Sequence, residues 1–515
     1  MKKLNIKKFF TTQALPLSVA IFTFLISAIF SRIGVDPHHD GIVFKPAIDL
    51  LEGKILFKNS YTQYGALLTI LQSLSLLIFG KYLIVIKLQT SFFYALTSFF
   101  LFKIWTIYEK KWLSLLSCLI WLAMAPFYIY LFLPWSSVYS LFFLVLTLYF
   151  LILSLQKHRH KYLFFSGITI GATFWTRQPV GIFLLIFSYL SFLLTLPKNK
   201  TKLHTVFRET IFIILGLLTI SIPILSWITI NGAFHDWWLQ SIVSAVVFGR
   251  TVGQNFQIKV IFQNLFTNSV GILSLWKLLP IFSVLYLLRS IIKKIRHQSN
   301  NSDNVQIILS LVSISSWMQY YPVPCFRHLF WAATPMMGLL PKFVHDFQHM
   351  FIFNKTKPNK IISAITLIIL LLPIIYLEIS IRMSNAVTKL QTVYYTTQLP
   401  TLKHMKMSMD EVLFYNNAFD IINTYPEKNI ITNGPDAIYG TLKPNTINFH
   451  PMYVNWLGIN KSVYPNYTEK LSDYVIKNKP IIFSPVTDLM PDYCPIGKPN
   501  WNQQILTIPC ELQNQ

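Results

Sequence analysis

Charged residues are scarce in this chain. Aspartate and glutamate together number 20 among 515 residues, and all charged residues make up only 12% of the sequence. A soluble protein of this length carries about twice that charged share. Hydrophobic residues make up 53%, and apolar runs near the length of a bilayer crossing recur through the first three quarters of the chain. The composition therefore excludes an ordinary soluble protein and predicts an α-helical polytopic membrane protein.

Other features are absent too. The chain has no P-loop lysine motif, which argues against an ATP-driven pump, and it has no internal repeat or low-complexity tract. The formal net charge is +24. The basic residues, however, form short clusters between apolar runs, which is the pattern of cytoplasmic loops rather than of a nucleic-acid surface. We therefore expect a lipid bilayer and no nucleic acid among the partners.

The start of the chain sets the expected orientation. Residues 1–10 are basic and precede an apolar stretch at 14–33, which is too long for the core of a typical signal peptide. We interpret this stretch as a retained anchor with a cytoplasmic N-terminus. The apolar segment at 66–79 has only about fourteen residues, whereas a crossing needs about 20.

Charge decides how that short segment is interpreted. If residues 66–79 lie at the interface, every later basic cluster is cytoplasmic; if they cross, every one is outside. The positive-inside rule favours the first topology, with about eleven crossings and an external C-terminus. The basic clusters are 109–111, 157–161, 198–202, 289–296 and 354–360. After 14–33, the predicted crossings are 88–107, 112–131, 135–155, 162–176, 179–196, 210–230, 270–288, 305–320, 329–341 and 361–380.

The composition changes near Ser384, where long apolar runs stop and polar residues, proline and tyrosine become frequent. Short strand-like runs at 429–432 and 480–483 alternate with helical patterns at 410–424 and 467–477, which predicts a small α/β domain. We therefore divide the chain into a membrane domain, 1–383, and an extracytoplasmic domain, 384–515. Cys494 and Cys510 could form a disulfide in an oxidising compartment.

The loop after the first crossing, 34–65, is the most distinctive stretch. It concentrates two acids and two histidines within five residues: Asp36, His38, His39 and Asp40. Residues 42–52 predict an amphipathic helix on the membrane surface, with Lys45 and Asp49 on its polar face and Gly53 as its terminator. This helix would hold Asp40 at the boundary between water and lipid.

Asp40 is our candidate catalytic residue, because a carboxylate can act as general base for an acceptor hydroxyl or help to hold a metal. Asp36 and His39 are candidate ligands of a divalent metal such as Mg²⁺ or Mn²⁺, although the spacing matches no specific zinc signature. A structural alternative is that Asp36 and Asp40 only cap the surface helix.

Two arginines are expected on the same side as Asp40. Arg177 and Arg327 end apolar segments, where an unpaired charge is costly and usually marks a functional site. Either arginine could instead extend to lipid headgroups. Because both lie beside aromatic residues on one side, we favour an anion site.

These residues together resemble the GT-C superfamily of polytopic glycosyltransferases, which includes protein O-mannosyltransferase-like enzymes and the aminoarabinose transferases of lipid A. The resemblance consists of an aspartate-bearing loop after the first crossing, the amphipathic helix ending in AIDLLEG (47–53), Tyr61-x-x-Tyr64-Gly65, and an apolar helix closing in Phe79-Gly80. It covers the first 110 residues by motif and the rest of the membrane part by architecture.

The resemblance implies a polyprenyl-phosphate-linked monosaccharide as donor. Asp40 matches the family aspartate, which acts as base or metal partner. Basic residues of outer loops hold the donor phosphate in this family, and Arg177, Arg327 and Lys54 are the candidates here. Two departures are Gly41, where many members have glutamate, and the loop at Gln63 to Gly65, where many have lysine or two prolines.

We therefore predict an enzyme of the inner (plasma) membrane that transfers a sugar, with inversion or retention, to a cell-envelope glycan, lipid or protein on the outer face. Residues expected to line the sugar or lipid groove, or to be simple interface residues, are Tyr61, Gln63, Tyr64, Trp135 and His328. Alternatives are a polysaccharide polymerase or ligase, a transporter of lipid-linked sugars, and a non-catalytic scaffold. A transporter would need polar residues deep within its crossings, a polymerase usually has its large loop late in the chain, and a scaffold would leave the Asp40 cluster without a purpose.

Overall fold

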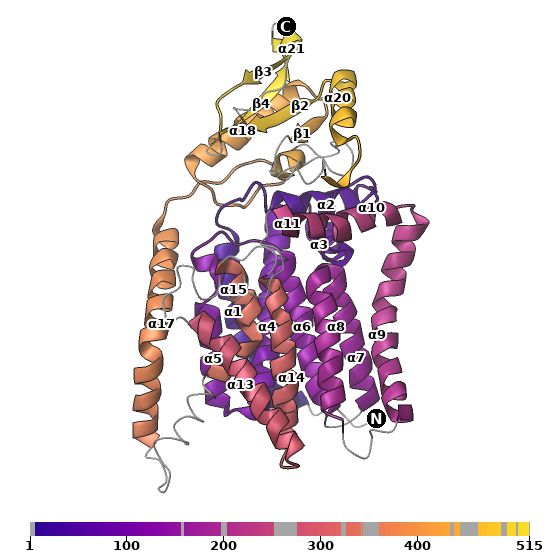
Figure 1. The fold of residues 1–515 in the computed structure, drawn as a ribbon. Coiled ribbons are helices and arrows are strands. Elements are labelled where there is room, and N and C mark those ends of the chain that lie inside the picture. The colour runs from indigo at the N-terminus through magenta and orange to yellow at the C-terminus, as the bar shows by residue number, and fades with distance from the viewer. Residues whose placement is uncertain are drawn as a thin grey trace.

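A bundle of long helices carries a small α/β domain at one end, which we call the domain end, and the N-terminus lies at the opposite end (Figure 1). The computed structural model describes residues 6–155, 159–196, 203–251, 275–320, 326–340, 342, 360–432, 437–442, 462–485, 492–500 and 503–513.

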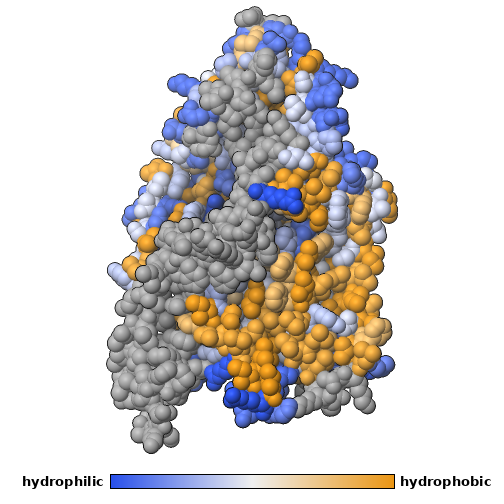
Figure 2. Space-filling view, in the orientation of Figure 1, coloured by the Kyte–Doolittle hydropathy of each residue, from blue (hydrophilic) through white to orange (hydrophobic). Residues whose placement is uncertain are grey.

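Five helical segments within these ranges are long and apolar enough to cross a membrane. They lie in α1 (Ile6–Ser31), α4 (Leu83–Tyr108), α5 with η1 (Lys111–Ala123 and Pro126–Tyr128), α6 (Ser136–Ser154) and α9 (Leu203–Ile230). Further helices of the bundle are α7 (Arg159–Thr176), α8 (Gln178–Leu194), α13 (Leu275–Ile295), α14 (Asn301–Ser316) and α17 (Lys360–Gln391). Figure 2 shows a hydrophobic belt over this part of the molecule, with hydrophilic residues at both ends.

Small residues allow α7 and α9 to pack closely. A methyl group added at Gly167 would collide with the carbonyl of Ile213, and one added at Gly216 would collide with the carbonyl of Phe164. Glycine at such positions lets helix backbones approach each other in an apolar environment, where packing rather than water exclusion drives association.

The basic clusters that the structure describes share the end of the bundle opposite the domain. Lys294 donates a hydrogen bond to the carbonyl of Leu194, which joins the ends of α13 and α8. Arg159 at the start of α7 pairs with Glu209 near the start of α9. Two predicted clusters, 198–202 and 354–360, lie wholly or almost wholly outside the described residues.

Two predicted crossings need correction. The segment predicted at 329–341 is not one continuous helix, because α15 (Phe326–Ala333) is followed by the 3-10 turn η5 (Thr334–Met336). The crossing predicted from residue 88 begins earlier, at Leu83. The added first turn contains Lys87, which lies buried within α4. The helix predicted at 66–79, in contrast, is α3 (Ala66–Phe79).

The helix predicted in the first loop is α2 (Gly41–Leu51), but its charged residues do not face water. Lys45 and Asp49 are both buried, and Lys45 Nζ lies 2.6 Å from Asp49 Oδ1. Lys54 Nζ approaches the same oxygen at 2.7 Å, and the Ser60 hydroxyl donates to Asp49 Oδ2 at 2.7 Å. The returning part of the loop therefore covers the face that we expected to be solvated.

The C-terminal domain, which contacts the first loop, is the predicted α/β unit. Its mixed sheet has the order β1-β2-β4-β3, with β1 parallel to β2 and the other pairs antiparallel. The strands are β1 (Ile430–Thr432), β2 (Ile481–Pro485), β3 (Tyr493–Ile496) and β4 (Gln504–Pro509), and the helices are α18 (Met409–Thr424), η7 (Ala437–Thr441), α20 (Tyr467–Asn478) and α21 (Cys510–Gln513). The structure shows both strands and both helices that the sequence predicts here, and it adds β3 and β4.

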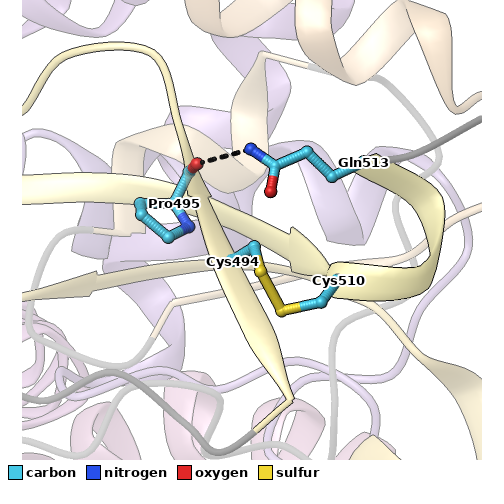
Figure 3. Close-up of a disulfide and its surroundings, with 4 residues drawn as sticks. All are labelled: Cys494, Pro495, Cys510 and Gln513. Carbon is cyan, nitrogen blue, oxygen red and sulfur yellow. Dashed lines mark hydrogen bonds between the residues drawn. A yellow bond between two sulfur atoms is a disulfide. The ribbon is translucent and has the colours of Figure 1, made fainter.

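A disulfide closes the end of this domain. Cys494 in β3 and Cys510 at the start of α21 are bonded, and Gln513 Nε2 donates to the carbonyl of Pro495 at 3.2 Å (Figure 3). The bond holds the last helix against an edge strand. Helix α17 leads into the domain without a break at residues 383 and 384, because it continues to Gln391.

Backbone hydrogen bonds join the domain and its linker to the first loop. Gly34 N donates to Lys406 O at 2.7 Å, and Ile438 N in η7 donates to Pro37 O at 3.1 Å. Gly41 lies so close to η7 that an added methyl group would collide with the backbone of Ala437 and Ile438. This contact explains why glycine follows Asp40 here, where a larger side chain has no room.

We expect Gly41→Ala to displace η7 from the first loop, because the obstacle is backbone rather than a flexible side chain. Limited proteolysis should cut the linker around residues 392–408 faster than in the wild type, and the melting temperature should fall. The control is Gly53→Ala, which has no atom near the new methyl but a φ of 82°, so it should cost only about 1 kcal/mol of backbone strain. Equal proteolysis of the Gly41→Ala variant and the wild type would contradict the tight contact.

Candidate active site

Three segments far apart in sequence meet around Tyr64 at the domain end. Burial raises the pKa of the Tyr64 hydroxyl. The guanidinium groups of Arg177 and Arg327 act to lower that pKa, and the Asp36 carboxylate acts to raise it. The first loop and the two predicted anion ligands are therefore close enough to act electrostatically on one residue, Tyr64.

Arg177 immediately precedes α8, in extended backbone, and its guanidinium is held by polar groups of other elements. Nη1 donates to Ser137 Oγ at 2.6 Å, and Nη2 donates to the carbonyl of Gln319 at 3.4 Å. Ser137 lies in the first turn of α6, so the guanidinium sits beside the N-terminal ends of two helices. Free backbone N–H groups and the helix dipole favour negative charge at such a place.

Arg327 is held by aromatic rings. Its guanidinium carbon lies 4.9 Å from the ring centre of Tyr130 and 5.0 Å from that of Trp135. Within the described part of the chain, no carboxylate lies within ion-pair distance of Arg327. Stacking on aromatic faces stabilises the cation without neutralising it, so its charge stays available to an anion.

Trp135 connects Arg327 to the first loop. The indole centre lies 4.6 Å from the His39 ring and 5.3 Å from the His328 ring. Three of the predicted site residues, together with Arg327, thus form one cluster at the start of α6.

Several buried polar atoms of this region have no hydrogen-bond partner among the described residues. They are Trp135 Nε1, Ser136 Oγ, Gln178 Nε2 and Gln319 Oε1. Buried polar groups of folded proteins almost always have partners, so each one needs an explanation. A polar ligand bound beside the two arginines would supply such partners.

Asp36 and His39 are bound to each other. His39 Nδ1 lies 2.9 Å from Asp36 Oδ2, while Asp36 Oδ1 accepts the backbone N–H groups of His38 and His39 at 3.1 and 2.8 Å. Burial raises the pKa of Asp36, but the hydrogen bonds and charge of His39 outweigh it and hold that pKa well below its usual value. Asp36 is therefore charged, and it orders the turn before α2.

Asp40 lies deeper than expected. Its side chain is completely buried, and Oδ2 lies 2.7 Å from Lys87 Nζ and accepts the backbone N–H of Asp36 at 2.9 Å. Oδ1 is buried and has no hydrogen-bond partner in the described ranges. Asp40 precedes α2 but does not cap it by a side-chain hydrogen bond. The carboxyl group is therefore enclosed by protein rather than open to solvent, because the first loop packs against η7 and α4.

Burial raises the pKa of Asp40 to about 6, and the nearby Lys87 ammonium opposes the rise. A carboxyl group with this pKa is ionised at neutral pH and is more basic than an exposed aspartate. Both properties suit a group that accepts a proton near neutral pH.

Lys87 is the one partner of Asp40 that sequence reasoning missed. The available signal was a lysine one turn inside an apolar helix, where a charge is rarely placed without a partner. Lys54, in contrast, was predicted as a phosphate ligand, but its ammonium pairs with Asp49, which makes it part of the network that supports α2.

The other predicted groove residues lie in the returning half of the loop. Tyr61 is buried, and Gln63 and Tyr64 are partly buried. Gln240 of the π-helical turn η3 (Leu239–Val243) fixes this segment by accepting from Thr62 N at 3.3 Å and donating to Phe57 O at 2.6 Å.

The residues here do not make a ready metal site. The described residues hold no group of three or more histidine, cysteine or acidic side chains that could bind an ion. Asp36 and His39 would supply two ligands, but Asp36 already accepts three hydrogen bonds, two of them from His39 itself. A metal at this pair would have to break that contact, so we route no step of the reaction through it.

Known proteins share parts of this sequence and most of the fold. The family model of dolichyl-phosphate-mannose-protein mannosyltransferases matches residues 66–227, from α3 to near the end of α9. No curated relative matches the sequence.

Solved structures of two proteins, among others, resemble most of the chain. ArnT from Cupriavidus metallidurans bound to undecaprenyl phosphate has 10% identity and a TM-score of 0.53, with 97% of this chain and 98% of that chain covered. The oligosaccharyltransferase of Archaeoglobus fulgidus, tethered to an acceptor peptide, has 14% identity and a TM-score of 0.51, with 92% and 69% covered. These likenesses establish the fold of a multi-pass membrane protein.

We expect Asp49→Asn to destabilise the loop that carries the site, because it leaves the charges of Lys45 and Lys54 without their carboxylate. Breaking a buried ion pair costs about 3–5 kcal/mol. Thermal unfolding of the purified protein in detergent should show a clearly lowered midpoint. Glu511→Gln, which removes an ion pair with Lys479 that is exposed on both sides, should change the midpoint little. A wild-type midpoint for Asp49→Asn would contradict the supporting role of this network.

Proposed function

We propose that this chain is a membrane glycosyltransferase of the GT-C superfamily, which transfers a sugar from a polyprenyl-phosphate carrier to an acceptor of the cell envelope. One observation carries the proposal: both arginines and the first loop contact the start of α6, Arg177 through Ser137 and Arg327 and His39 through Trp135. A cationic site beside a carboxyl group suits a reaction that releases a phosphate and accepts a proton.

The arginines suit the change in charge during transfer. A sugar linked to a lipid phosphate carries one negative charge on the phosphodiester, and the leaving lipid monophosphate gains a second. Arg177 and Arg327 together provide two positive charges, and a guanidinium binds phosphate oxygens through two parallel hydrogen bonds. Groups aimed at charge that develops in the transition state accelerate the reaction more than groups that only bind the ground state.

Asp40 would act on the acceptor. As the acceptor oxygen bonds to the anomeric carbon of the sugar, the bond from that carbon to the phosphate oxygen breaks and its electron pair stays on the phosphate. The acceptor proton passes to Asp40 Oδ1, the oxygen that has no partner within the described chain. The acceptor reaches this oxygen only if the cover formed by η7 and the first loop moves.

The remaining site residues would shape the substrate groove. Trp135 and His328 lie beside Arg327 and would form one wall of the groove. Tyr61, Gln63 and Tyr64, from the returning half of the first loop, would contribute further lining. The unpaired polar atoms of Trp135 and its neighbours would hydrogen-bond the donor phosphate or the sugar hydroxyls. The acceptor would be a glycan such as lipopolysaccharide, another lipid, or a protein.

Charge and cysteine chemistry support an orientation. The basic clusters favour a cytoplasmic location for the end opposite the domain. The domain end, with the site, would then face the outside of the inner membrane, where an oxidising environment favours the bond between Cys494 and Cys510. Undecaprenyl phosphate, found with ArnT, is a lipid of the class that we propose as carrier.

We expect Asp40→Asn to abolish transfer while the protein still inserts into the membrane, because the amide cannot accept the acceptor proton. In the wild type, the rate should fall as the pH is lowered through about 6, since protonation of Asp40 removes the base. The assay is sugar transfer by cells or membranes that contain equal amounts of each variant, followed by mass spectrometry of the envelope glycans.

Asp36→Asn is the matched comparison, since it removes the other acid of the turn. It should retain measurable transfer, because its proposed role is to order the turn through His39. Full activity of Asp40→Asn would exclude Asp40 as the base, and loss of activity in Asp36→Asn alone would transfer the role to Asp36.

We expect Arg327→Ala to weaken binding of undecaprenyl phosphate by about tenfold or more, as loss of a charge-assisted contact costs about 1.5–3 kcal/mol. Binding to the purified protein in lipid nanodiscs measures this directly. Lys54→Met and Arg296→Ala remove a positive charge from the α2 network and from the opposite end of the bundle, so neither should change the affinity. Equal affinity of Arg327→Ala and the wild type would remove Arg327 from the site.

A further inference from the structure

Lys87 is a completely buried lysine in a membrane-spanning helix. It lies one turn inside α4, at the domain end, and its side chain has no exposed surface. A charged group in such a place is costly unless it is paired. Its ammonium lies 2.7 Å from Asp40 Oδ2 and donates to the carbonyl of Gly34 at 3.0 Å. Both contacts are with the first loop, so Lys87 joins helix α4 to that loop.

The two carboxylate oxygens of Asp40 have different surroundings. Oδ2 receives the Lys87 ammonium and the backbone N–H of Asp36, whereas Oδ1 receives neither. The carboxylate is thus held by one oxygen and the other is left to react. The ammonium also favours the charged form of a carboxyl group that burial would otherwise protonate.

Few other charges act on Asp40. Asp36, on the same turn, repels its negative charge and raises its pKa. On α2, Lys45 is paired with Asp49, and η7 contributes Tyr439, whose hydroxyl contacts Asn500. The last turn of α1 carries no titratable side chain. Lys87 is therefore the nearby positive charge that keeps Asp40 ionised.

We propose that Lys87 is a positioning residue of the transfer reaction, which binds Asp40 Oδ2 so that the carboxylate stays charged and presents Oδ1 to the acceptor. This inference rests on the proposed role of Asp40 as base. Lys87 itself touches neither substrate and accepts no proton. Without its ammonium, burial is opposed only by neutral hydrogen bonds, and Asp40 is protonated at neutral pH.

The test compares pH profiles of transfer for the wild type, Lys87→Met and Lys87→Arg. The acidic limb of kcat/KM for Lys87→Met should move to higher pH by about 1–3 units, the usual effect of a nearby opposite charge. Activity should return toward the wild-type level at alkaline pH. Lys87→Arg keeps the charge and should keep the wild-type profile, and the affinity for undecaprenyl phosphate should be unchanged in all three proteins. If Lys87→Met does not fold, Lys87→Gln keeps a donor for Oδ2 without charge and serves the same comparison.

Infrared difference spectroscopy separates this inference from the proposed function, because it follows the carboxyl group without turnover. Subtracting the spectrum of the matching Asp40→Asn variant should reveal a protonated carboxyl band at pH 7.5 in Lys87→Met and none in the wild type. Absence of the band in Lys87→Met, or low activity at every pH in a folded variant, would overturn the positioning role. A band together with wild-type transfer would instead show that Asp40 is not the base, and both assignments would fall.

Discussion

The ion pair between Asp40 and Lys87 joins the first loop to the helix bundle, and the arrangement of the site depends on it. Both side chains are completely buried at the domain end. Neither charge could remain there alone, because an unpaired buried ion costs several kcal/mol. The pair therefore fixes the turn before α2 on top of α4. The C-terminal domain packs on this same turn: η7 donates a backbone hydrogen bond to Pro37 and lies against Gly41.

The two arginines at the same end of the bundle have contacts of a different kind from those of Lys87. Arg327 rests between aromatic rings, and Arg177 contacts a serine hydroxyl and a backbone carbonyl. Stacking on the rings holds the Arg327 guanidinium in place and does not cancel its charge. Lys45 and Lys54 of the loop, in contrast, are paired with the Asp49 carboxylate. This contrast separates the groups that support the fold from those that we assign to the phosphate, and it explains why Lys54 belongs to the first set.

The sequence predicts the parts of this structure that depend on local pattern, and less of those that depend on distant partners. Periodicity and terminators identified α2 and α3 closely, and charge clusters identified which loops share an end. Short strand-like runs predicted β1 and β2. The sequence did not predict β3, because it contains a proline and becomes a strand only by pairing with β4. Burial of Asp40 could not be predicted, because Lys87 and η7 are brought to it only by tertiary packing. The amphipathic pattern of α2 likewise predicted a solvated face that Ser60 and Lys54 in fact cover.

The central claim is that a single sugar leaves a lipid phosphate at the domain end. It is tested most directly by comparing envelope glycans, by mass spectrometry, between cells that have this gene and cells that lack it. Our account predicts the loss of one sugar mass from a glycan, lipid or protein that is otherwise intact, and its return when the gene is restored. Loss of entire polysaccharide chains, or an unchanged set of glycans together with accumulation of the lipid-linked sugar on the cytoplasmic side, would contradict it.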